Sequence, residues 1–218
     1  MSGFVAVIRV LTTQDPELLA AHGWQMERRY GLLTVSRCIP DQPHGIYNEE
    51  TERRAVPKIV KLAREMASEG ASAIVVSCAA DPGVAELRSE LKIPVIGAGS
   101  AVAAVARALA ERVGVLNLTE GAPGPVRRIL ADSFVGEDAP EGVGNTLDLM
   151  TDWGRQAATR AAARLVEAGA GALVLACTGY ATIGMAEEVR RRFGVVAVDP
   201  VDAAGLMAWF AVGRQEAK

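Results

Sequence analysis

Apolar runs alternate with amphipathic segments along most of the chain. The runs 4–11 (FVAVIRVL) and 72–78 (SAIVVSC) are continuously apolar and rich in β-branched residues, which is typical of strands covered on both faces. The segment 48–70 instead carries apolar residues every three or four positions, as an amphipathic helix does. Strand, helix and strand follow one another within about 30 residues, which is the length of a βαβ unit and requires a parallel sheet. The pattern therefore predicts an α/β fold.

The same pattern gives the order of elements and two details of helix ends. Asp81 is expected to cap a helix that has Pro82 at its first position, and Pro57 should bend its helix or end the first turn. We assign no element to 135–144. The predicted strands are 4–11, 31–39, 72–78, 93–99, 113–118, 171–177 and 195–199, and the predicted helices are 48–70, 82–91, 100–113, 126–134, 148–168, 185–193 and 203–212.

Two strands that end in cysteine are near-copies of one another. Residues 68–78 align with 167–177, so that Cys177 follows Cys78 by 99 positions, and each copy is preceded by a helix and followed by a loop, a helix and a strand. The repeat predicts a duplication, or at least two structurally equivalent halves. The identical pairs are Gly70/Gly169, Ala71/Ala170, Ala73/Ala172, Val75/Val174 and Cys78/Cys177.

Composition narrows the class of protein. The chain has 218 residues, half of them hydrophobic, and can therefore bury a substantial core. A net charge of −3 gives no basic footprint for a nucleic acid. Three cysteines and the absence of a basic and apolar leader at the N-terminus predict a cytoplasmic protein with free thiols. The uncharged stretch 168–186 contains four glycines and a polar run, so we interpret it as a buried strand and loop and expect no membrane partner.

The two cysteines predict the chemistry. In parallel α/β sheets, ligands bind at the carboxyl ends of the strands, which is where Cys78 and Cys177 lie. If the halves face each other about an approximate two-fold axis, the thiols enter one cleft from opposite sides. One thiolate can then remove a proton from a carbon next to a carbonyl while the other thiol delivers a proton to the opposite face. The enolate would need donors, such as N–H groups of 79–83 and 178–182 and the Thr178 hydroxyl.

Four motifs carry a family resemblance. The stretches SCAADPG, PVIGAG, VGVLNLT and ACTGYATIG, in this order and spacing, resemble the Asp/Glu/hydantoin racemase superfamily, and among its branches most closely hydantoin racemase-like proteins. The resemblance covers essentially the whole chain. It implies two similar parallel-sheet α/β domains related by a pseudo-two-fold, with the active site in the interdomain cleft. We expect the first domain to comprise 1–98 plus 206–218 and the second 99–205.

The resemblance also implies the site residues and the partners. Cys78 and Cys177 would be the acid–base pair of a cofactor-independent racemase or epimerase that acts on a 5-substituted hydantoin or a related amino-acid derivative. A homo-oligomer is expected by analogy, and a small molecule is the expected partner. The expected substrate-binding residues are Arg9, Thr12, Ala79, Thr119, Thr178 and Gly179.

One motif departs from the family. After the first strand this chain reads RVLTTQDPE, where many hydantoin and allantoin racemases have an Asn-Pro-Asn-type loop. Arg9, Thr12 and Thr13 are therefore candidates to contact a different group, such as a carboxylate. Arg9 could equally be the polar end of its strand.

The other reactive side chains are interpreted as structural. Cys38 has no counterpart in the second half, and His22 and His44, the only histidines, are expected to be solvated. No paired spacing such as CxxC or HxxxH predicts a metal site. The string IPVIGAGSAV lacks the third small residue of a dinucleotide fingerprint, since Val102 stands there, so no cofactor is expected.

Two other functions stay open. The first is a cysteine enzyme of the same fold, similar to maleate isomerase or arylmalonate decarboxylase. The second is a small-molecule-binding domain that has lost turnover.

Overall fold

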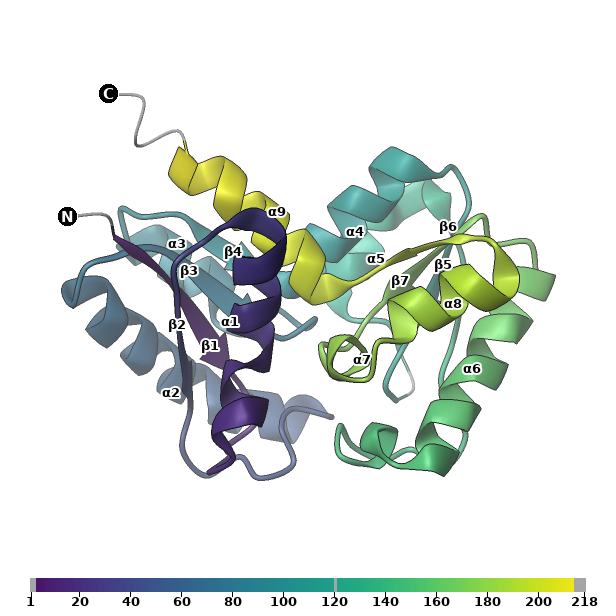
Figure 1. Cartoon of the computed structure of the whole chain (residues 1–218), viewed down its shortest axis with the longest axis horizontal. Coiled ribbons are helices and arrows are strands. Elements are labelled where there is room, and N and C mark those ends of the chain that lie inside the picture. Colours follow the sequence, from purple (N-terminus) through teal and green to yellow (C-terminus); the bar gives the residue numbers. More distant parts are fainter. Residues whose placement is uncertain (1–2, 120, 214–218) are drawn as a thin grey trace.

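The computed structural model describes residues 3–119 and 121–213 and contains two parallel sheets of four strands each (Figure 1). The sheets have the same strand order, β2-β1-β3-β4 and β6-β5-β7-β8, and every neighbouring pair is parallel. The predicted α/β class is therefore confirmed. The strands are β1 (Phe4–Arg9), β2 (Thr34–Cys38), β3 (Ala71–Ser77), β4 (Val95–Gly97), β5 (Val113–Leu116), β6 (Phe134–Asp138), β7 (Ala172–Leu175) and β8 (Val196–Val198).

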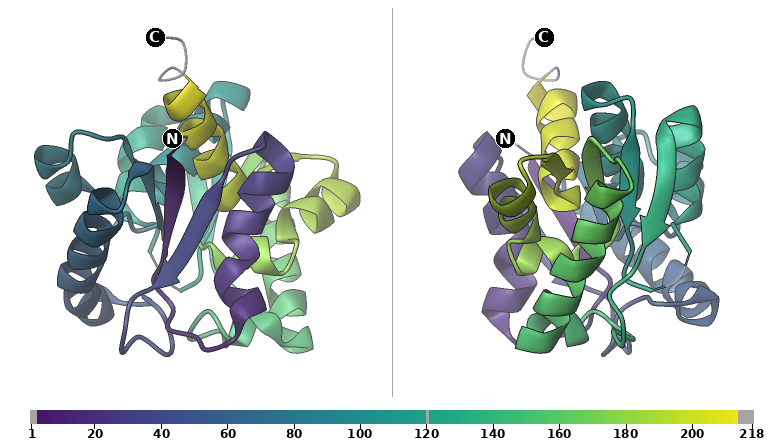
Figure 2. Two further views of the ribbon diagram at one scale, coloured as in Figure 1. Left: turned by 60° about the vertical axis from the view of Figure 1, so that its left-hand side comes forward. Right: turned by 90° about the vertical axis from the view of Figure 1, so that its right-hand side faces the viewer.

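Helices cover both faces of each sheet, and Figure 2 shows α1 and α2 on opposite sides of the first one. The helix α9 packs against α1, α4 and β3, and so lies where the two halves meet (Figure 1). The helices are α1 (Pro16–Tyr30), α2 (Glu49–Ser68), α3 (Val84–Glu90), α4 (Ala98–Leu109), α5 (Gly124–Leu130), α6 (Asp152–Glu167), α7 (Gly179–Thr182), α8 (Met185–Phe193) and α9 (Pro200–Gly213), with 3-10 turns at Ala131–Ser133 and Asp148–Met150.

The repeated strands occupy equivalent places. Within its own sheet, each of β3 and β7 is the third strand in chain order, and each pairs with the first strand of that sheet. The glycines before them, Gly70 and Gly169, have left-handed φ angles of 100° and 90°, which explains why glycine stands in both copies.

The apolar core has three parts. Two clusters lie between a sheet and its outer helices, α2 and α3 in the first half and α6 and α8 in the second. The third cluster joins the halves, since it contains buried residues of both sheets together with those of α4 and α9. The predicted boundary between residues 205 and 206 falls inside α9, and the one between 98 and 99 falls in the first turn of α4. How the chain divides into domains stays a prediction.

Most predicted elements are confirmed within a few residues, but three were not predicted: the helix α1, the strand β6 and the short helix α7. The helix α1 begins after Asp15, whose carboxylate accepts hydrogen bonds from the N–H groups of Glu17 and Leu18. The strand β6 begins at Phe134, which we expected to end a helix, and α5 already ends at Leu130. Pro57 does not end the first turn of its helix, because α2 continues from Glu49 to Ser68.

The prediction that Asp81 caps the helix directly after it is wrong. The helix that follows it begins only at Val84 after Gly83, and Asp81 itself has a left-handed φ of 54°. Its carboxylate instead accepts hydrogen bonds from the N–H groups of Gly99 (2.7 Å) and Ser100 (2.9 Å) in the first turn of α4. Asp81 therefore caps a different helix and ties the loop after Cys78 to it.

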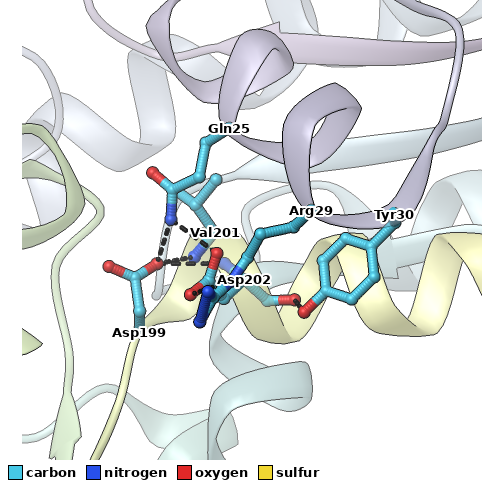
Figure 3. A network of polar contacts seen from close by, with 6 residues as sticks. All are labelled: Gln25, Arg29, Tyr30, Asp199, Val201 and Asp202. Carbon is cyan, nitrogen blue, oxygen red and sulfur yellow. Dashed lines mark hydrogen bonds and ion pairs between the residues drawn. The ribbon is translucent and has the colours of Figure 1, made fainter.

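A polar network joins α1 to the start of α9 (Figure 3). Asp199 is buried, and its Oδ1 accepts hydrogen bonds from the N–H groups of Val201 (2.8 Å) and Asp202 (3.0 Å) and from Nε2 of Gln25 (3.2 Å). Arg29 Nε lies 2.9 Å from Asp202 Oδ2. Burial raises the pKa of Asp199 to about 6, although these hydrogen bonds oppose the shift.

Replacing Asp199 with asparagine should remove a pH dependence of stability. The folded protein holds the Asp199 proton more tightly than the unfolded chain, whose aspartates titrate near 3.9, so its contribution favours folding below about pH 4 and is lost as the pH rises towards 6. Urea unfolding of wild type and Asp199→Asn at intervals between pH 4 and 7 measures it. We expect the difference between them to change by on the order of 2 kcal/mol over that window. Asparagine keeps an oxygen that can accept the same backbone hydrogen bonds, so the two proteins differ mainly in the titration of residue 199. Parallel pH profiles would therefore contradict the raised pKa of Asp199.

Candidate active site

The carboxyl ends of the strands from both sheets surround one cavity of about 510 Å³. Arg9 ends β1, Cys78 and Ala79 follow β3, Asn117 follows β5, and Cys177 follows β7 by two residues. The segments 45–49 and 121–125 complete the walls. Sites of parallel α/β proteins lie at this end of the strands, so this cavity is the candidate active site.

Cys78 and Cys177 both line the cavity and are both buried, with 7% and 9% of their surface exposed. Each sulfur faces the backbone N–H two residues further on, which is that of Ala80 for Cys78 and of Gly179 for Cys177. The Gly179 N–H donates to Cys177 Sγ at 3.3 Å. Equivalent positions of the two halves thus give each thiol the same backbone donor.

The electrostatic surroundings of the two thiols differ. Burial raises the pKa of both thiols, and the backbone donors oppose this rise. Near Cys78, the charges of Cys177, Asp81 and Glu52 raise its pKa further. Near Cys177, the hydroxyl of Thr146, with Oγ1 4.0 Å from Sγ, favours the thiolate. Ionisation is therefore more strongly opposed at Cys78.

Arg9 lines the cavity, but its guanidinium is turned to the protein. Nη1 donates to the carbonyls of Leu18 (2.5 Å) and Leu19 (3.1 Å) in α1, and Arg9 is 5% exposed. Burial lowers its pKa to about 10, so it is still a cation at neutral pH. Thr12 does not line the cavity: its hydroxyl donates to the Ile39 carbonyl at 2.6 Å and accepts from the Gln42 N–H.

The other predicted binding residues lie at the cavity wall. Ala79, Thr119, Thr178 and Gly179 all line it. The hydroxyl of Thr119 donates to the Tyr47 carbonyl at 3.4 Å, and that of Thr178 donates to the Ser77 carbonyl at 3.2 Å. The Thr178 bond crosses from the second half to the first.

The expectation that His22 is solvated is wrong. His22 is 1% exposed, and its Nδ1 lies 2.7 Å from Ser77 Oγ and its Nε2 3.3 Å from Thr182 Oγ1. It lies inside α1, on the side of the helix that packs against the sheet. His44 is exposed as predicted. Cys38 is half-buried and donates from Sγ to the Thr13 carbonyl at 3.7 Å, outside the cavity.

Asn117 is a cavity residue that the sequence analysis missed. It is 2% exposed, and its Nδ2 donates to Glu137 Oε2 at 3.3 Å. Within the described part of the chain, its Oδ1 has no hydrogen-bond partner. The pairing of β1 and β5 with the repeated strands makes Asn117 the counterpart of Arg9, and this correspondence is the signal that could have found it.

A metal-ligand cluster and a membrane-spanning helix are both absent from residues 3–119 and 121–213. No three histidine, cysteine, aspartate or glutamate side chains gather there in a way that could hold a metal ion. No helix in these ranges is both long enough and apolar enough to cross a bilayer.

Comparison with known proteins decides the family. The sequence pattern of the family described as Asp/Glu/Hydantoin racemase matches residues 28–208. The chain belongs to this family. Membership makes it an enzyme of the racemase class, which is an isomerase, and confirms the resemblance seen in the motifs.

One protein with a similar sequence and two with a similar structure agree with this assignment. The hydantoin racemase of Rhizobium meliloti is 29% identical over 183 residues, which are 80% of this chain and 74% of that protein. The structure of allantoin racemase from Klebsiella pneumoniae has a TM-score of 0.84 at 23% identity and covers 98% of this chain and 89% of its own. A variant of arylmalonate decarboxylase has a TM-score of 0.72 at 19% identity and covers 98% and 93%. The two structural likenesses show a shared fold.

Proposed function

We propose that the protein is a cofactor-independent racemase or epimerase of a 5-substituted hydantoin or a related neutral amino-acid derivative, with Cys78 and Cys177 as its acid–base pair. The observation that carries this proposal is that the two cysteines of the repeat line one cavity, each with the same backbone donor at its sulfur. A two-base mechanism needs two such groups on opposite faces of one carbon.

The proposed reaction is a proton exchange between the two thiols through the substrate. One thiolate takes the proton from C5 of the ring and becomes a thiol, and the electron pair of the C–H bond moves into the adjacent carbonyl to form an enolate. The second thiol then protonates the opposite face of C5 and becomes the thiolate. Backbone N–H groups of 79–83 and 178–182 are the proposed donors to the enolate oxygen.

The charges of the cavity favour a neutral substrate. Among the residues that the structure describes, the charged ones that line it are Arg9, Glu49 and Glu52, and the Arg9 guanidinium already donates to two carbonyls of α1. The carboxylates of an aspartate or glutamate substrate would thus be repelled by Glu49 and Glu52, and the one cation, Arg9, already donates hydrogen bonds to α1. A hydantoin carries no charge and offers two N–H donors, and the Asn117 carboxamide oxygen is an acceptor for one of them once its side chain turns towards the ring.

Burial raises the pKa of both thiols, and of the two Cys177 is proposed to ionise more readily. Its sulfur is near the Thr146 hydroxyl as well as the Gly179 N–H, whereas Cys78 lies near the acidic groups of Asp81 and Glu52. Iodoacetamide reacts with thiolates, so it should modify Cys177 faster than Cys78.

Proton NMR in deuterated water tests the proposed function. Single enantiomers of 5-substituted hydantoins, L-aspartate and L-glutamate are incubated with the enzyme, and the Cα–H signal and the optical rotation are followed together. We expect the hydantoin signal and rotation to decay, prior iodoacetamide to abolish both, and the amino acids to stay unchanged. Samples without enzyme correct for spontaneous exchange.

The same experiment separates the alternatives. Decay with the amino acids alone would contradict the neutral substrate. A lack of exchange with every compound, followed by turnover of a maleate or an arylmalonate, would favour the isomerase or the decarboxylase. Ligand-dependent thermal stabilisation without any exchange would favour a binding domain. A homo-oligomer also stays a prediction.

A further inference from the structure

The imidazole of His22 contacts residues next to both cysteines in the chain. Its Nδ1 is 2.7 Å from the hydroxyl of Ser77, which directly precedes Cys78. Its ring also hydrogen-bonds the backbone of Thr178, which directly follows Cys177, and its Nε2 is 3.3 Å from Thr182 Oγ1 in α7. One side chain from α1 thus joins residues that are about a hundred positions apart in the sequence.

A direct bond between the two segments completes the arrangement. Thr178 Oγ1 donates to the Ser77 carbonyl at 3.2 Å, so Ser77 is held by the second half through its backbone and by His22 through its side chain. Ser77 and His22 are each 1% exposed, and Thr178 is 9% exposed. Water cannot readily replace a partner that is lost at such buried positions.

The ring is suited to hold a fixed geometry and not to carry charge. Burial, together with the nearby charge of Arg9, lowers the pKa of His22 well below its ordinary value, so the imidazole is neutral at physiological pH. A neutral imidazole has one donor and one acceptor nitrogen, and the hydroxyls of Ser77 and Thr182 can fill either role.

We propose that His22 is a positioning residue that sets the separation of the Cys78 and Cys177 thiols across the cavity. This inference rests on the proposed function, since the separation matters only if both thiols act on one carbon. Inversion requires the two thiols to be correctly placed at the same time, because the second must protonate the face that the first did not use. Exchange of the Cα proton with retention requires only one of them.

The ratio of exchange to inversion therefore tests the role of His22. In His22→Phe, which keeps a planar aromatic ring and removes both nitrogens, we expect inversion to fall at least about tenfold while exchange of one enantiomer falls much less. His22→Gln, which keeps a donor and an acceptor, should restore part of the inversion rate. Both rates come from NMR and optical rotation on one sample in deuterated water.

A matched variant separates positioning from general destabilisation. Gln25 lies in the same helix, less than one turn further on, and its partners are Asp199 and Asp202, away from the thiols. Gln25→Met should lower the unfolding temperature and leave the ratio of exchange to inversion as in wild type. Equal losses of exchange and inversion in His22→Phe, or no loss of either, would overturn the proposal.

Alkylation keeps the inference testable without a substrate. We expect His22→Phe to change the iodoacetamide reaction rates of Cys78 and Cys177 several-fold, measured for each thiol by peptide mass spectrometry, while Gln25→Met leaves them unchanged. Unchanged rates would overturn the positioning role. If wild type exchanges no substrate but the rates change as expected, the proposed function fails and the structural link between His22 and the thiols stands.

Discussion

Replacing either Cys78 or Cys177 with serine should lower the racemisation rate by at least 10²–10⁴-fold, which is the range for the loss of a general acid or base. The serine hydroxyl has nearly the shape of the thiol but does not ionise near neutral pH. Each variant keeps one functional thiol and can therefore still remove a proton from the enantiomer that faces it. The two variants should exchange the Cα proton of opposite enantiomers with solvent deuterium, without inversion.

The measurement is NMR and optical rotation for each pure enantiomer with each variant. Cys38→Ser is the matched control, because Cys38 is half-buried, lies outside the cavity and donates only a weak bond to the Thr13 carbonyl. It should racemise like wild type. Full racemisation by Cys78→Ser and Cys177→Ser would exclude the two-thiol mechanism. Exchange of the same enantiomer by both variants would show that the two thiols do not act on opposite faces of the substrate carbon.

Replacing Gly99 with alanine should cause the largest loss of stability among conservative substitutions near the cavity. Gly99 lies in the first turn of α4, and a Cβ there would be 1.9 Å from the Ala79 carbonyl oxygen and 2.7 Å from its carbon. Backbone atoms cannot rotate away, so the segment after Cys78 must move. Alanine favours a helix over glycine by only about 1 kcal/mol, whereas such overpacking costs about 1–3 kcal/mol or more.

Urea unfolding and the racemisation rate measure the two consequences. We expect Gly99→Ala to lose about 2 kcal/mol of unfolding free energy and, because Ala79 adjoins Cys78, most of its activity. Gly124→Ala is the control for stability, since Gly124 opens α5 and a Cβ there meets nothing within 4 Å. Its unfolding midpoint should lie at the same urea concentration as that of wild type or at a higher one. A Gly99→Ala protein with the wild-type unfolding midpoint would contradict the close contact.

The fold was predictable where the local pattern was strong. Buried strands such as β3 and β7 have continuous apolar runs, and these indicated the α/β class and the repeat. The strand β6 (FVGED) was missed because it lies at the edge of its sheet, contains a glycine and two acids, and has no fully buried residue. The helix α1 was missed although its start, Asp15 followed by Pro16, has the residues of an N-cap and a first helical position.

The cavity was predictable to the same extent. The 99-residue repeat placed Cys78 and Cys177 at equivalent strand ends, and the structure brings both to the cavity. His22 was misjudged because its surroundings come from contacts 55 and 160 positions away, which no local pattern reveals. The partner of Asp81 was misjudged for a similar reason, since a left-handed backbone turns its carboxylate from the next helix to α4.

The apolar core that joins the two sheets also limits how the molecule can move. Val75 of β3 and Val174 of β7 belong to one buried cluster with residues of α4 and α9. A hinge motion that parted the sheets would expose this cluster to water, at about 25 cal/mol for each Å² of apolar surface. Burial of this cluster therefore opposes any hinge motion that would part the strands leading to Cys78 and Cys177.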